Sequence, residues 1–437
     1  MITQIETLSY RSLRYIRQPL GPFQVLIGPN ASGKSTFLDV VAFLADVVRE
    51  KEGVIGAVEA RAPDMRDLTW MRRGDSFELA VEALVPAALR RQKNGQAARL
   101  RYEVRVGTQA PGHEVNLLGE TLWLRPELEE DETTARAFFP LPPAPPATIV
   151  RSPGQRTPLG WRRVVNKVPD SGNDYFRSET SDWNNLFRLG PRRSALANLP
   201  EDEDKFPAAI WFRRLLLEGV QRLALNSDAL RRPSRPGVTR RFLPDGSNLP
   251  WVVRDLEESN AGRIADWVAH LRTALPDLQG IRTVEREEDR HRYLMLKYTN
   301  GLEIPSWLVS DGTLRMLALS LLAYLPDLTG IYLVEEPENG IHPRAVETVW
   351  QSLQSVYGAQ VLLATHSPVI LSLAAPGDVL CFGRDAAGAT DIVRGSDHPQ
   401  LASWRHEVDL GTLFAAGVLD SGTNCPQAHG CALPLVV

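Results

Sequence analysis

The residues best suited to chemistry lie near the start of the chain, in a segment that we call the phosphate loop. It consists of Gly28-Pro29-Asn30-Ala31-Ser32-Gly33-Lys34-Ser35 and matches the pattern G-x-x-x-x-G-K-[ST]. Its glycines let successive backbone N–H groups curl around a β-phosphate at a helix N-terminus, where the dipole is positive. Lys34 would supply charge to the β- and γ-phosphates, and the Ser35 hydroxyl could ligate Mg²⁺.

Two adjacent acids and a histidine late in the chain could act on a bound phosphate. Glu335 and Glu336 follow the apolar run 331–334, so one carboxylate could hold a metal ion while the next polarises an attacking water. His366 follows the next apolar run and could donate a hydrogen bond to a γ-phosphate. Adjacent acids are common at strand ends and a single histidine is usually structural, so it is the phosphate loop that favours catalytic roles here.

The elements predicted around the phosphate loop fit its mechanism. Residues 23–27 are apolar and β-branched and have Gly-Pro pairs on both sides, which is typical of a buried strand. From 35 to 48, apolar residues recur at three- and four-residue spacing, which predicts a helix with one face packed on a sheet. The order strand, glycine-containing loop, helix is the one that a phosphate site requires.

The acids and the histidine lie in a second series of alternating elements. Strands are predicted at 331–334, 360–364 and 378–382, with a helix over 343–356 and a short helix from Pro368. Alternating strands and helices favour a parallel, doubly wound sheet. We therefore expect an α/β fold.

The middle of the chain has a different pattern. Residues 76–85 and 100–106 alternate apolar with polar side chains, which predicts half-exposed antiparallel strands. The proline-rich segment 141–146 predicts an exposed stretch, the polar segment 152–185 predicts loops, and 210–225 has helical periodicity. No heptad repeat is sustained, so we expect no long coiled-coil arm.

Composition and charge narrow the class of protein. The 437 residues suit one large core with an insertion, or two domains, and 43% hydrophobic with 23% charged residues is typical of a globular chain. The net charge of -4 gives no global case for binding nucleic acid or a membrane. The chain has no apolar run of about 18 residues and no apolar N-terminal block, so we expect a cytoplasmic location. The three cysteines form no CxxC pair, so we predict neither a disulfide framework nor a zinc site.

Two local clusters of basic residues are the remaining candidates for a contact with nucleic acid. Trp211 and Phe212 precede two arginines, but their helical spacing favours a core-facing helix over a platform for stacking bases. A second cluster could contact a phosphate backbone, although a solvated or ion-paired face is the favoured interpretation. That cluster consists of Arg231, Arg232, Arg235, Arg240 and Arg241.

Four motifs together carry a resemblance to a known class of protein. They are the phosphate loop, Ser310-Asp311-Gly312-Thr313-Leu314-Arg315, Leu333-Val334-Glu335-Glu336-Pro337-Glu338-Asn339-Gly340-Ile341-His342-Pro343, and Thr365-His366-Ser367. The chain resembles the ABC-type ATPase heads of the SMC, RecF and OLD class. More narrowly, it resembles compact bacterial ATPases of that class from anti-phage defence operons, such as the ATPase subunits of Septu and PARIS. The resemblance covers about 1–50 and 300–420, is weaker at 224–235 and 243–249, and is not recognised in 107–205.

The resemblance implies a fold and an arrangement of domains. The fold would be a P-loop NTPase with an ABC-type head, an antiparallel β subdomain and a helical insertion. The head would comprise 1–106 and 251–420, the insertion 107–250, and the tail 421–437. The cofactors would be ATP and Mg²⁺.

Catalytic and binding roles follow from the same resemblance. Glu336 would be the general base, Glu335 would hold Mg²⁺ together with Ser35, and His366 would be the switch histidine. Lys34 would be both catalytic and nucleotide-binding. The nucleotide-binding residues would be Gly28, Pro29, Asn30, Ala31, Ser32, Gly33, Lys34, Ser35 and Thr36, with Asn30 at the outer edge of the loop.

A second protomer would complete the site. Ser310, Asp311 and Gly312 would form a signature that caps the γ-phosphate bound by the partner, and Asn339 and His342 would belong to a loop, 339–342, that crosses the interface. The resemblance thus implies a homodimer or higher oligomer formed through the heads. An effector protein, a nuclease or toxin, would be a further partner, with nucleic acid a candidate and no membrane involved.

The expected function is therefore a Mg²⁺-dependent ATP hydrolase that acts as an ATP-gated dimeric switch on DNA or on an effector protein, in anti-phage defence. DNA repair or recombination, and a weakly hydrolysing ATP clamp, stay open as alternatives. An ABC transporter subunit fits poorly, because the signature lies much further from the phosphate loop than in transporter heads. A self-contained nuclease also fits poorly, because no further strand-end cluster of acids follows His366.

Three departures from the class affect the expected chemistry. Glu335 stands where the class has Asp, which adds a methylene between backbone and metal and predicts slow turnover, since Mg²⁺ geometry is strict. Residues 54–86, where a metal-sensing Gln is expected, contain no Gln. The signature is Ser-Asp-Gly-Thr rather than Ser-Gly-Gly-Gln, so contacts beyond Ser310 and Gly312 are unassigned.

Overall fold

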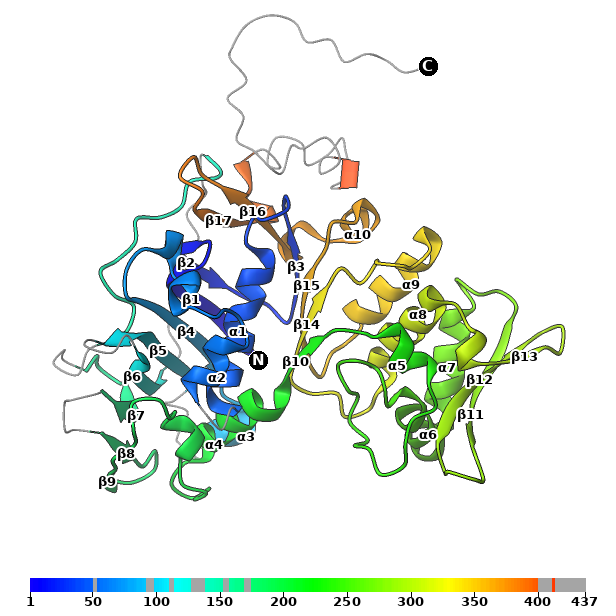
Figure 1. Ribbon diagram of the computed structural model, residues 1–437, viewed down its shortest axis with the longest axis horizontal. Coiled ribbons are helices and arrows are strands. Elements are labelled where there is room, and N and C mark those ends of the chain that lie inside the picture. The colour runs from blue at the N-terminus through cyan, green and yellow to red at the C-terminus, as the bar shows by residue number, and fades with distance from the viewer. Residues whose placement is uncertain are drawn as a thin grey trace, which may run out of the picture.

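Two lobes flank a central six-stranded sheet (Figure 1). One lobe carries an eight-stranded antiparallel sheet, and the other combines helices with a three-stranded sheet. The computed structural model describes residues 1–49, 53–91, 98–109, 114–126, 138–151, 157–168, 174–399 and 411–412. Within these residues, no helix is long and apolar enough to cross a bilayer. The tail expected at 421–437 lies outside the described residues.

The six-stranded sheet confirms the predicted parallel α/β core. Its strands follow the order β10-β14-β15-β3-β16-β17, and each neighbouring pair is parallel except β16 with β17. The four strands predicted from apolar runs, β3, β14, β15 and β16, all form within one or two residues of their expected ends. The bounds are β3 (Phe23–Ile27), β10 (Val220–Leu223), β14 (Ile331–Glu335), β15 (Gln360–Ala364), β16 (Val379–Arg384) and β17 (Thr390–Arg394).

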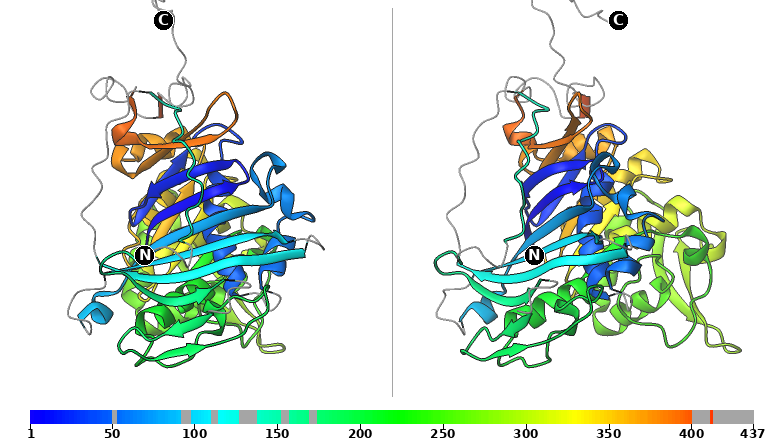
Figure 2. Two further views of the ribbon diagram at one scale, coloured as in Figure 1. Left: turned by 90° about the vertical axis from the view of Figure 1, so that its left-hand side faces the viewer. Right: turned by 60° about the vertical axis from the view of Figure 1, so that its left-hand side comes forward.

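The eight-stranded sheet is larger than the sequence patterns indicated. Its order is β2-β1-β4-β5-β6-β7-β8-β9, and Figure 2 shows it as a curved layer across one side of the molecule. The expected domain boundary at 106/107 falls inside β5, and strands also form within the expected loop segment 152–185. The bounds are β1 (Ile2–Tyr10), β2 (Leu13–Pro19), β4 (Ser76–Leu84), β5 (Arg99–Gln109), β6 (Glu114–Arg125), β7 (Arg162–Lys167), β8 (Tyr175–Arg177) and β9 (Asn184–Leu186).

Helix α1 (Lys34–Arg49) lies between the two large sheets and packs on both. Phe37 contacts Phe382 of the six-stranded sheet, with ring centroids 5.6 Å apart, and Phe43 contacts Phe77 of the eight-stranded sheet at 5.5 Å. The prediction of a helix was right, but the prediction of one packed face was wrong. Apolar residues at three- and four-residue spacing here cover two sides of the helix, because it is covered by a sheet on each side.

The strands predicted to be half-exposed are in fact buried on both faces over most of their length. Every residue of β4 except its two end residues is buried. One face packs on α1, while the polar face is covered by residues 148–151, which we call the strap. Glu78 holds the strap by accepting hydrogen bonds from the backbone N–H groups of Ile149 at 2.6 Å and Val150 at 3.2 Å. Alternation did not mean solvent exposure, because the polar side chains find partners inside the protein.

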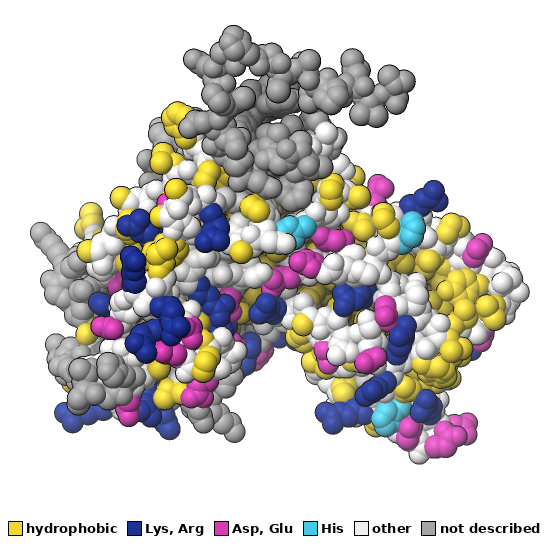
Figure 3. Space-filling view, turned by 45° about the horizontal axis from the view of Figure 1, so that its top comes forward, with side chains coloured by type: hydrophobic (Ala, Val, Ile, Leu, Met, Phe, Trp, Pro, Cys, Tyr) yellow, Lys and Arg dark blue, Asp and Glu magenta, His cyan; other side chains and the backbone are white. Residues whose placement is uncertain are grey.

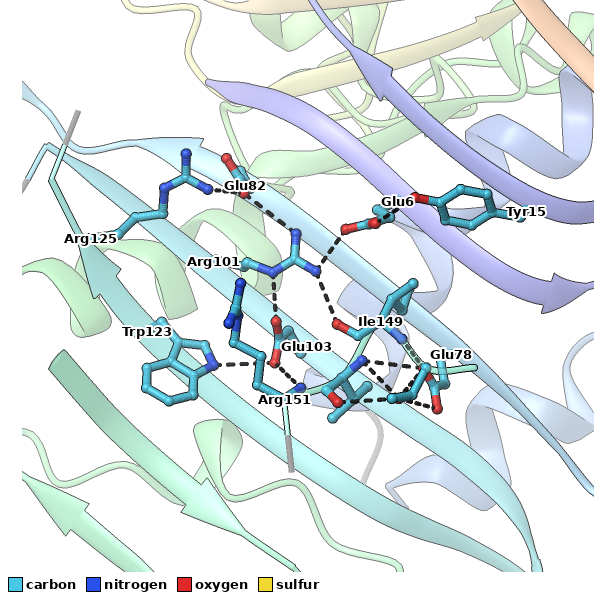
Figure 4. A network of polar contacts seen from close by, with 12 residues as sticks. Glu6, Tyr15, Glu78, Glu82, Arg101, Glu103, Trp123, Arg125, Ile149 and Arg151 are labelled. Atoms are coloured by element: carbon cyan, nitrogen blue, oxygen red, sulfur yellow. Dashed lines mark hydrogen bonds and ion pairs between the residues drawn. The ribbon is translucent and has the colours of Figure 1, made fainter. Parts of the chain in front are cut away.

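A buried ionic network joins four strands beneath the strap (Figure 4). The guanidinium of Arg101 pairs with Glu103 at 2.5 Å, with Glu6 at 2.7 Å and with Glu82 at 3.4 Å. Burial alone would lower the pKa of Arg101, but the Glu103 and Glu6 carboxylates raise it above its usual value. Arg125 pairs with Glu82 as well. A buried charge without partners would be strongly destabilising, so this network is a structural unit.

The chain then crosses from the first lobe to the second through residues 207–223. Helix α4 (Pro207–Arg214) begins at a proline and is followed by a π-helical turn, Leu215–Gly219, and then by β10. The predicted helix over 210–225 was therefore wrong beyond residue 219. Parallel pairing of β10 with β14 outweighs the local helical periodicity, since it adds a strand to the edge of the central sheet.

The core of the second lobe is continuous with one face of the six-stranded sheet, because residues of β3, β14, β15 and β16 belong to the same buried cluster as the helices of this lobe. Helix α9 begins at Pro343 as predicted, and α10 begins at Pro368 as predicted. The strands are β11 (Leu278–Glu285), β12 (Arg292–Tyr298) and β13 (Glu303–Pro305). Apart from α1 and α4, the α-helices of the described residues have these bounds: α2 (Val54–Glu59), α3 (Ala87–Arg91), α5 (Ser227–Arg231), α6 (Leu249–Ser259), α7 (Ala261–Leu271), α8 (Asp311–Leu321), α9 (Pro343–Gln354) and α10 (Pro368–Leu373).

Candidate functional site

The phosphate loop connects β3 to α1 and has three residues with left-handed backbone angles. The φ angles are 143° at Gly28, 61° at Ala31 and 106° at Gly33. A Cβ atom at Gly28 would come within 2.3 Å of the Phe382 carbonyl oxygen, and one at Gly33 within 2.6 Å of Thr390 Oγ1. Both glycines are therefore needed for backbone angle and for space, which explains the two fixed glycines of the motif.

Lys34 lies across the loop that precedes it. Its ammonium donates to the carbonyl oxygens of Gly28 at 2.7 Å and Pro29 at 3.0 Å, and the residue is buried. Ser35 follows as the second residue of α1, so the amide nitrogens of the first helical turn face the loop. This arrangement places one cation and a helix N-terminus at the same point, as a phosphate ligand requires.

Glu335 is the last residue of β14 and reaches the phosphate loop. Its Oε2 accepts a hydrogen bond of 2.5 Å from Ser35 Oγ. Its Oε1 accepts from Arg222 of β10, at 3.0 Å from Nε and 2.6 Å from Nη2. A hydroxyl and a carboxylate side by side are hard oxygen donors of the kind that Mg²⁺ takes, usually with one or two carboxylates, phosphate oxygens and waters. The donor set at Ser35 and Glu335 therefore fits Mg²⁺.

No purely protein-made metal cage is present among the described residues, where no group of three or more His, Cys, Asp or Glu side chains is placed to hold an ion.

Glu336 adopts an unusual backbone conformation, with a φ of 47°. Its N–H donates to the carbonyl oxygen of Ala364 at 2.8 Å, which continues the pairing of β14 with β15 beyond the strand end. Its side chain is exposed, and Oε2 accepts a hydrogen bond from the Asn339 amide. Positive φ at a residue other than glycine costs free energy and often marks a functional residue.

His366 lies after β15 and is fixed through Glu338. Glu338 Oε1 accepts from the Thr365 hydroxyl at 2.6 Å and from the His366 N–H at 3.0 Å. Glu338 follows β14 closely, so a single carboxylate ties the segment after β14 to the segment after β15. His366 lines the same cleft as the phosphate loop.

These groups meet in one open cleft of 450 Å³ at the carboxyl ends of the parallel strands. Figure 3 shows acidic and histidine side chains gathered where the lobes meet. The cleft is lined by Asn30 to Thr36, Glu335, Glu336 and His366, as the sequence predicted, whereas Gly28 and Pro29 contact Lys34 instead. Sequence reasoning missed four lining residues, because none lies in a motif: Arg11, Ser12, Ala364 and Arg384.

The predicted signature lies in the second lobe, away from this cleft. Ser310 caps α8 by accepting from the Thr313 N–H at 3.3 Å, and Asp311 pairs with Arg231 at 2.8 Å. Neither they nor Gly312 line the described cleft. A Cβ at Gly312 would come within 2.3 Å of the Gly340 carbonyl oxygen, so the signature packs directly on the loop 339–342.

The loop 339–342 joins Glu336 to α9. Asn339 donates to Glu336, while its carbonyl oxygen accepts from Arg315 at 3.4 Å. His342 caps α9, since its Nδ1 accepts from the Arg344 N–H at 3.2 Å. Asn339 is thus in contact with the cleft residues, whereas His342 is exposed at the helix start.

The basic clusters have mostly structural partners. Arg240 pairs with Asp255 at 3.4 Å, and Arg231 pairs with Asp311, which favours the ion-paired interpretation for those two. On α4, Phe212 is fully buried against Tyr102, with ring centroids 5.8 Å apart. The prediction of a core-facing helix at this point is confirmed.

The fold is that of a P-loop NTPase with an ABC-type head. A family model described as "AAA domain, putative AbiEii toxin, Type IV TA system" matches residues 23–372. The chain belongs to this family, and it therefore carries an ATPase domain of the AAA type. No curated protein matches the sequence.

Similar solved structures are heads of SMC proteins. One, an SMC head bound to the C-terminal winged-helix domain of ScpA, has 13% identity and a TM-score of 0.50, with 90% of this chain and 96% of that chain covered. An SMC head with an extended coiled coil bound to the C-terminal domain of ScpA, from Pyrococcus furiosus, has 11% identity, coverage of 90% and 95%, and a TM-score of 0.48. The SMC head of Thermotoga maritima has 10% identity, coverage of 90% and 98%, and a TM-score of 0.41. At these identities the likeness concerns the fold.

Proposed function

We propose that this protein is a Mg²⁺-dependent ATP hydrolase whose ATP-bound form is a dimeric switch. The observation that carries the proposal is the single cleft in which the phosphate loop, the Ser35–Glu335 pair and Glu336 meet. Family membership supports ATP as the nucleotide. The absence of glutamine from the described lining leaves the metal-sensing role of the class without a candidate.

The phosphate loop, the two acids and His366 would have separate tasks in hydrolysis. The phosphate loop and Lys34 bind and orient the β- and γ-phosphates, and Ser35 and Glu335 would hold Mg²⁺, which supplies charge neutralisation to the phosphates when bound. Glu336 accepts a proton from a water molecule while the oxygen of that water attacks the γ-phosphorus. The bond between the γ-phosphorus and the β-γ bridging oxygen then breaks. The products are ADP and inorganic phosphate. His366 donates a hydrogen bond to the γ-phosphate.

Dimerisation would bring the signature to a second cleft. Ser310 to Gly312 lie in the lobe that does not contain the phosphate loop, so they are free to face the cleft of another copy. The signature packs on the loop 339–342, and Asn339 of that loop donates a hydrogen bond to Glu336. Contact between the signature and a second protomer would therefore be connected to the general base. We propose that this contact completes the site only when ATP is bound.

The biological output would be control of an effector protein, a nuclease or toxin, in anti-phage defence. The family description, which names a toxin of a toxin–antitoxin system, supports a setting of this kind. We also propose a direct contact with DNA, which the experiment described next tests as well.

The test is ATP hydrolysis and oligomeric mass, measured with and without double-stranded DNA. Lys34→Ala should abolish nucleotide binding, and Glu336→Gln should retain binding while losing roughly 100-fold or more in turnover. Glu336→Gln should also accumulate as a larger ATP-bound species. Glu347→Gln, an exposed acid on α9, is the matched control and should behave as wild type.

Each result has a defined meaning. If Glu336→Gln turns over as fast as wild type, Glu336 is not the base and the protein is better described as an ATP clamp. If the ATP-bound variant stays monomeric, the dimeric switch is wrong. Stimulation by DNA would favour direct contact, and its absence would favour control through a partner protein.

A further inference from the structure

Glu335 is held from two sides, by one residue that lines the cleft and one that does not. Ser35 contacts Oε2 from the cleft side at 2.5 Å. Arg222 contacts Oε1, with Nε at 3.0 Å and Nη2 at 2.6 Å. Arg222 is not among the described residues that line the cleft; it borders a smaller cavity of 210 Å³ beside α1, together with Asp46 and Arg61.

The register of the sheet explains how Arg222 reaches this carboxylate. Arg222 of β10 lies beside Leu333 of β14 in the parallel pairing, and Glu335 is two residues further along β14. Side chains two residues apart on a strand point to the same face, so Arg222 and Glu335 share a face of the sheet. The long arginine side chain then extends along that face to Oε1.

The second observation is the length of Glu335 itself. Glutamate has one more rotatable bond than aspartate, so its carboxylate has more orientations that do not face Ser35. A guanidinium that binds one oxygen with two N–H groups removes much of this freedom, because arginine forms geometrically restrictive hydrogen bonds with carboxylates. The other oxygen is then left directed at Ser35.

We propose that Arg222 is a positioning residue for the magnesium site: it fixes Glu335 Oε1 so that Oε2 alone is presented to the metal beside Ser35. This inference rests on the proposed function and deepens it. It gives a physical reason why glutamate serves at this position, since the arginine on the neighbouring edge strand compensates for the added methylene.

An opposite role can be stated from the same contacts. A positive charge beside a metal ligand also repels a cation, and if repulsion were the larger effect, Arg222 would weaken Mg²⁺ binding. Two facts favour positioning: Nε and Nη2 both donate to the oxygen that Ser35 does not use, and Arg222 lines the small cavity rather than the cleft.

The experiment measures binding of a fluorescent ATP analogue to the full chain over a series of Mg²⁺ concentrations and in EDTA. For Arg222→Ala, the Mg²⁺ concentration at half-maximal binding should rise by roughly 10-fold to 100-fold, the usual cost of losing a residue that orients a metal ligand. Affinity in EDTA should stay within about 2-fold of wild type, because only the metal-dependent part is affected. Arg222→Lys should have a Mg²⁺ requirement between those of wild type and Arg222→Ala, because lysine has one ammonium group and cannot donate to Oε1 from two nitrogens.

A control and a double variant separate this role from support of the fold. Arg49→Ala removes an arginine that borders the same small cavity but donates to the Leu217 carbonyl oxygen at 3.0 Å, and it should keep the wild-type Mg²⁺ requirement. Adding Arg222→Ala to Glu335→Asp should change the Mg²⁺ requirement much less than it does in the wild type, because the shorter carboxylate does not reach Arg222 in the same way.

The proposal is overturned if Arg222→Ala leaves the Mg²⁺ requirement unchanged or lowers it, the latter being the result of charge repulsion. An equal loss of affinity in EDTA also overturns it, since that indicates a general structural role. Failure of the proposed function has a different signature, because the wild type itself would then show no Mg²⁺-dependent binding of the ATP analogue.

Discussion

The two large sheets of this protein differ in where they place charged side chains. In the eight-stranded sheet, Arg101, Glu103 and Glu82 lie in mid-strand, are buried, and are paired with one another. In the six-stranded sheet, Glu335 and Glu336 come at the end of β14, where the first residue is half-buried and the second is exposed. The difference teaches that a dense cluster of buried charges does not by itself mark a functional site.

The physical reason is the cost of burial. A charge in the interior is tolerated only when partners satisfy it, so the charges around Arg101 are used on one another rather than on a ligand. The acids at the end of β14 keep access to solvent, and a ligand can replace water there at lower cost. Solvent access with convergent geometry, rather than charge density, distinguishes the cleft.

The largest expected effect on stability comes from breaking the buried network. Arg101→Ala should lower the free energy of unfolding by about 3–5 kcal/mol, because three carboxylates lose a shared partner. The measurement is urea unfolding followed by circular dichroism. Arg105→Ala, on the same strand but exposed and 3.7 Å from Glu78, should cost at most about 1 kcal/mol. Equal costs for the two variants would contradict the contrast between the sheets.

Arg101→Ala should also leave ATP turnover per folded molecule unchanged, which is the reverse of what Glu336→Gln should do. A large loss of turnover in folded Arg101→Ala would show that the antiparallel sheet contributes to the chemistry.

An intermediate effect is expected from the phosphate loop backbone. Gly28→Ala should abolish nucleotide binding and cost about 1–3 kcal/mol of stability, because the new Cβ meets the Phe382 carbonyl oxygen at 2.3 Å. Gly237→Ala is the matched control: its φ is also positive, at 77°, but nothing lies within 4 Å of its Cβ. Nucleotide titration and thermal unfolding of both variants isolate the steric part. Retained nucleotide binding in Gly28→Ala would contradict the steric argument.

The smallest expected effect concerns acid stability near the end of the six-stranded sheet. Burial lowers the pKa of His398 from 6.5 to about 4, and its ring lies 5.0 Å from that of Phe139. Because the folded-state pKa is lower than the unfolded one, the stabilisation is complete above pH 6.5 and is lost as pH falls toward 4. Between pH 6.5 and pH 4, the free energy of unfolding should fall by about 1–2 kcal/mol more for wild type than for His398→Gln.

The measurement is urea unfolding at several pH values, with His291→Gln, a histidine of the β11–β12 turn, as the control. Parallel curves for wild type and His398→Gln would show that His398 does not contribute to acid sensitivity.

The sequence by itself determined the parts of this protein that local physics controls. Apolar runs predicted β3, β14 and β15, the first with Gly-Pro pairs on both sides, and prolines at 343 and 368 predicted two helix starts. The phosphate loop was predictable because its glycines, lysine and serine act within one strand-loop-helix unit. The position of Glu335 and Glu336 beside the phosphate loop was also predictable, since parallel strands bring their carboxyl ends to one edge of a sheet.

Only the tertiary structure decided what depends on residues far apart in the chain. Local periodicity placed Arg222 in a helix, yet pairing with β14 made it part of a strand and brought it to Glu335. Likewise, Arg11 reaches the cleft from the turn between β1 and β2, and Arg384 reaches it from the end of β16, although neither lies in a motif. Alternation in β4 did not reveal that the strap covers its polar face. Such contacts arise from packing free energy between distant segments, and no short window of sequence contains both partners.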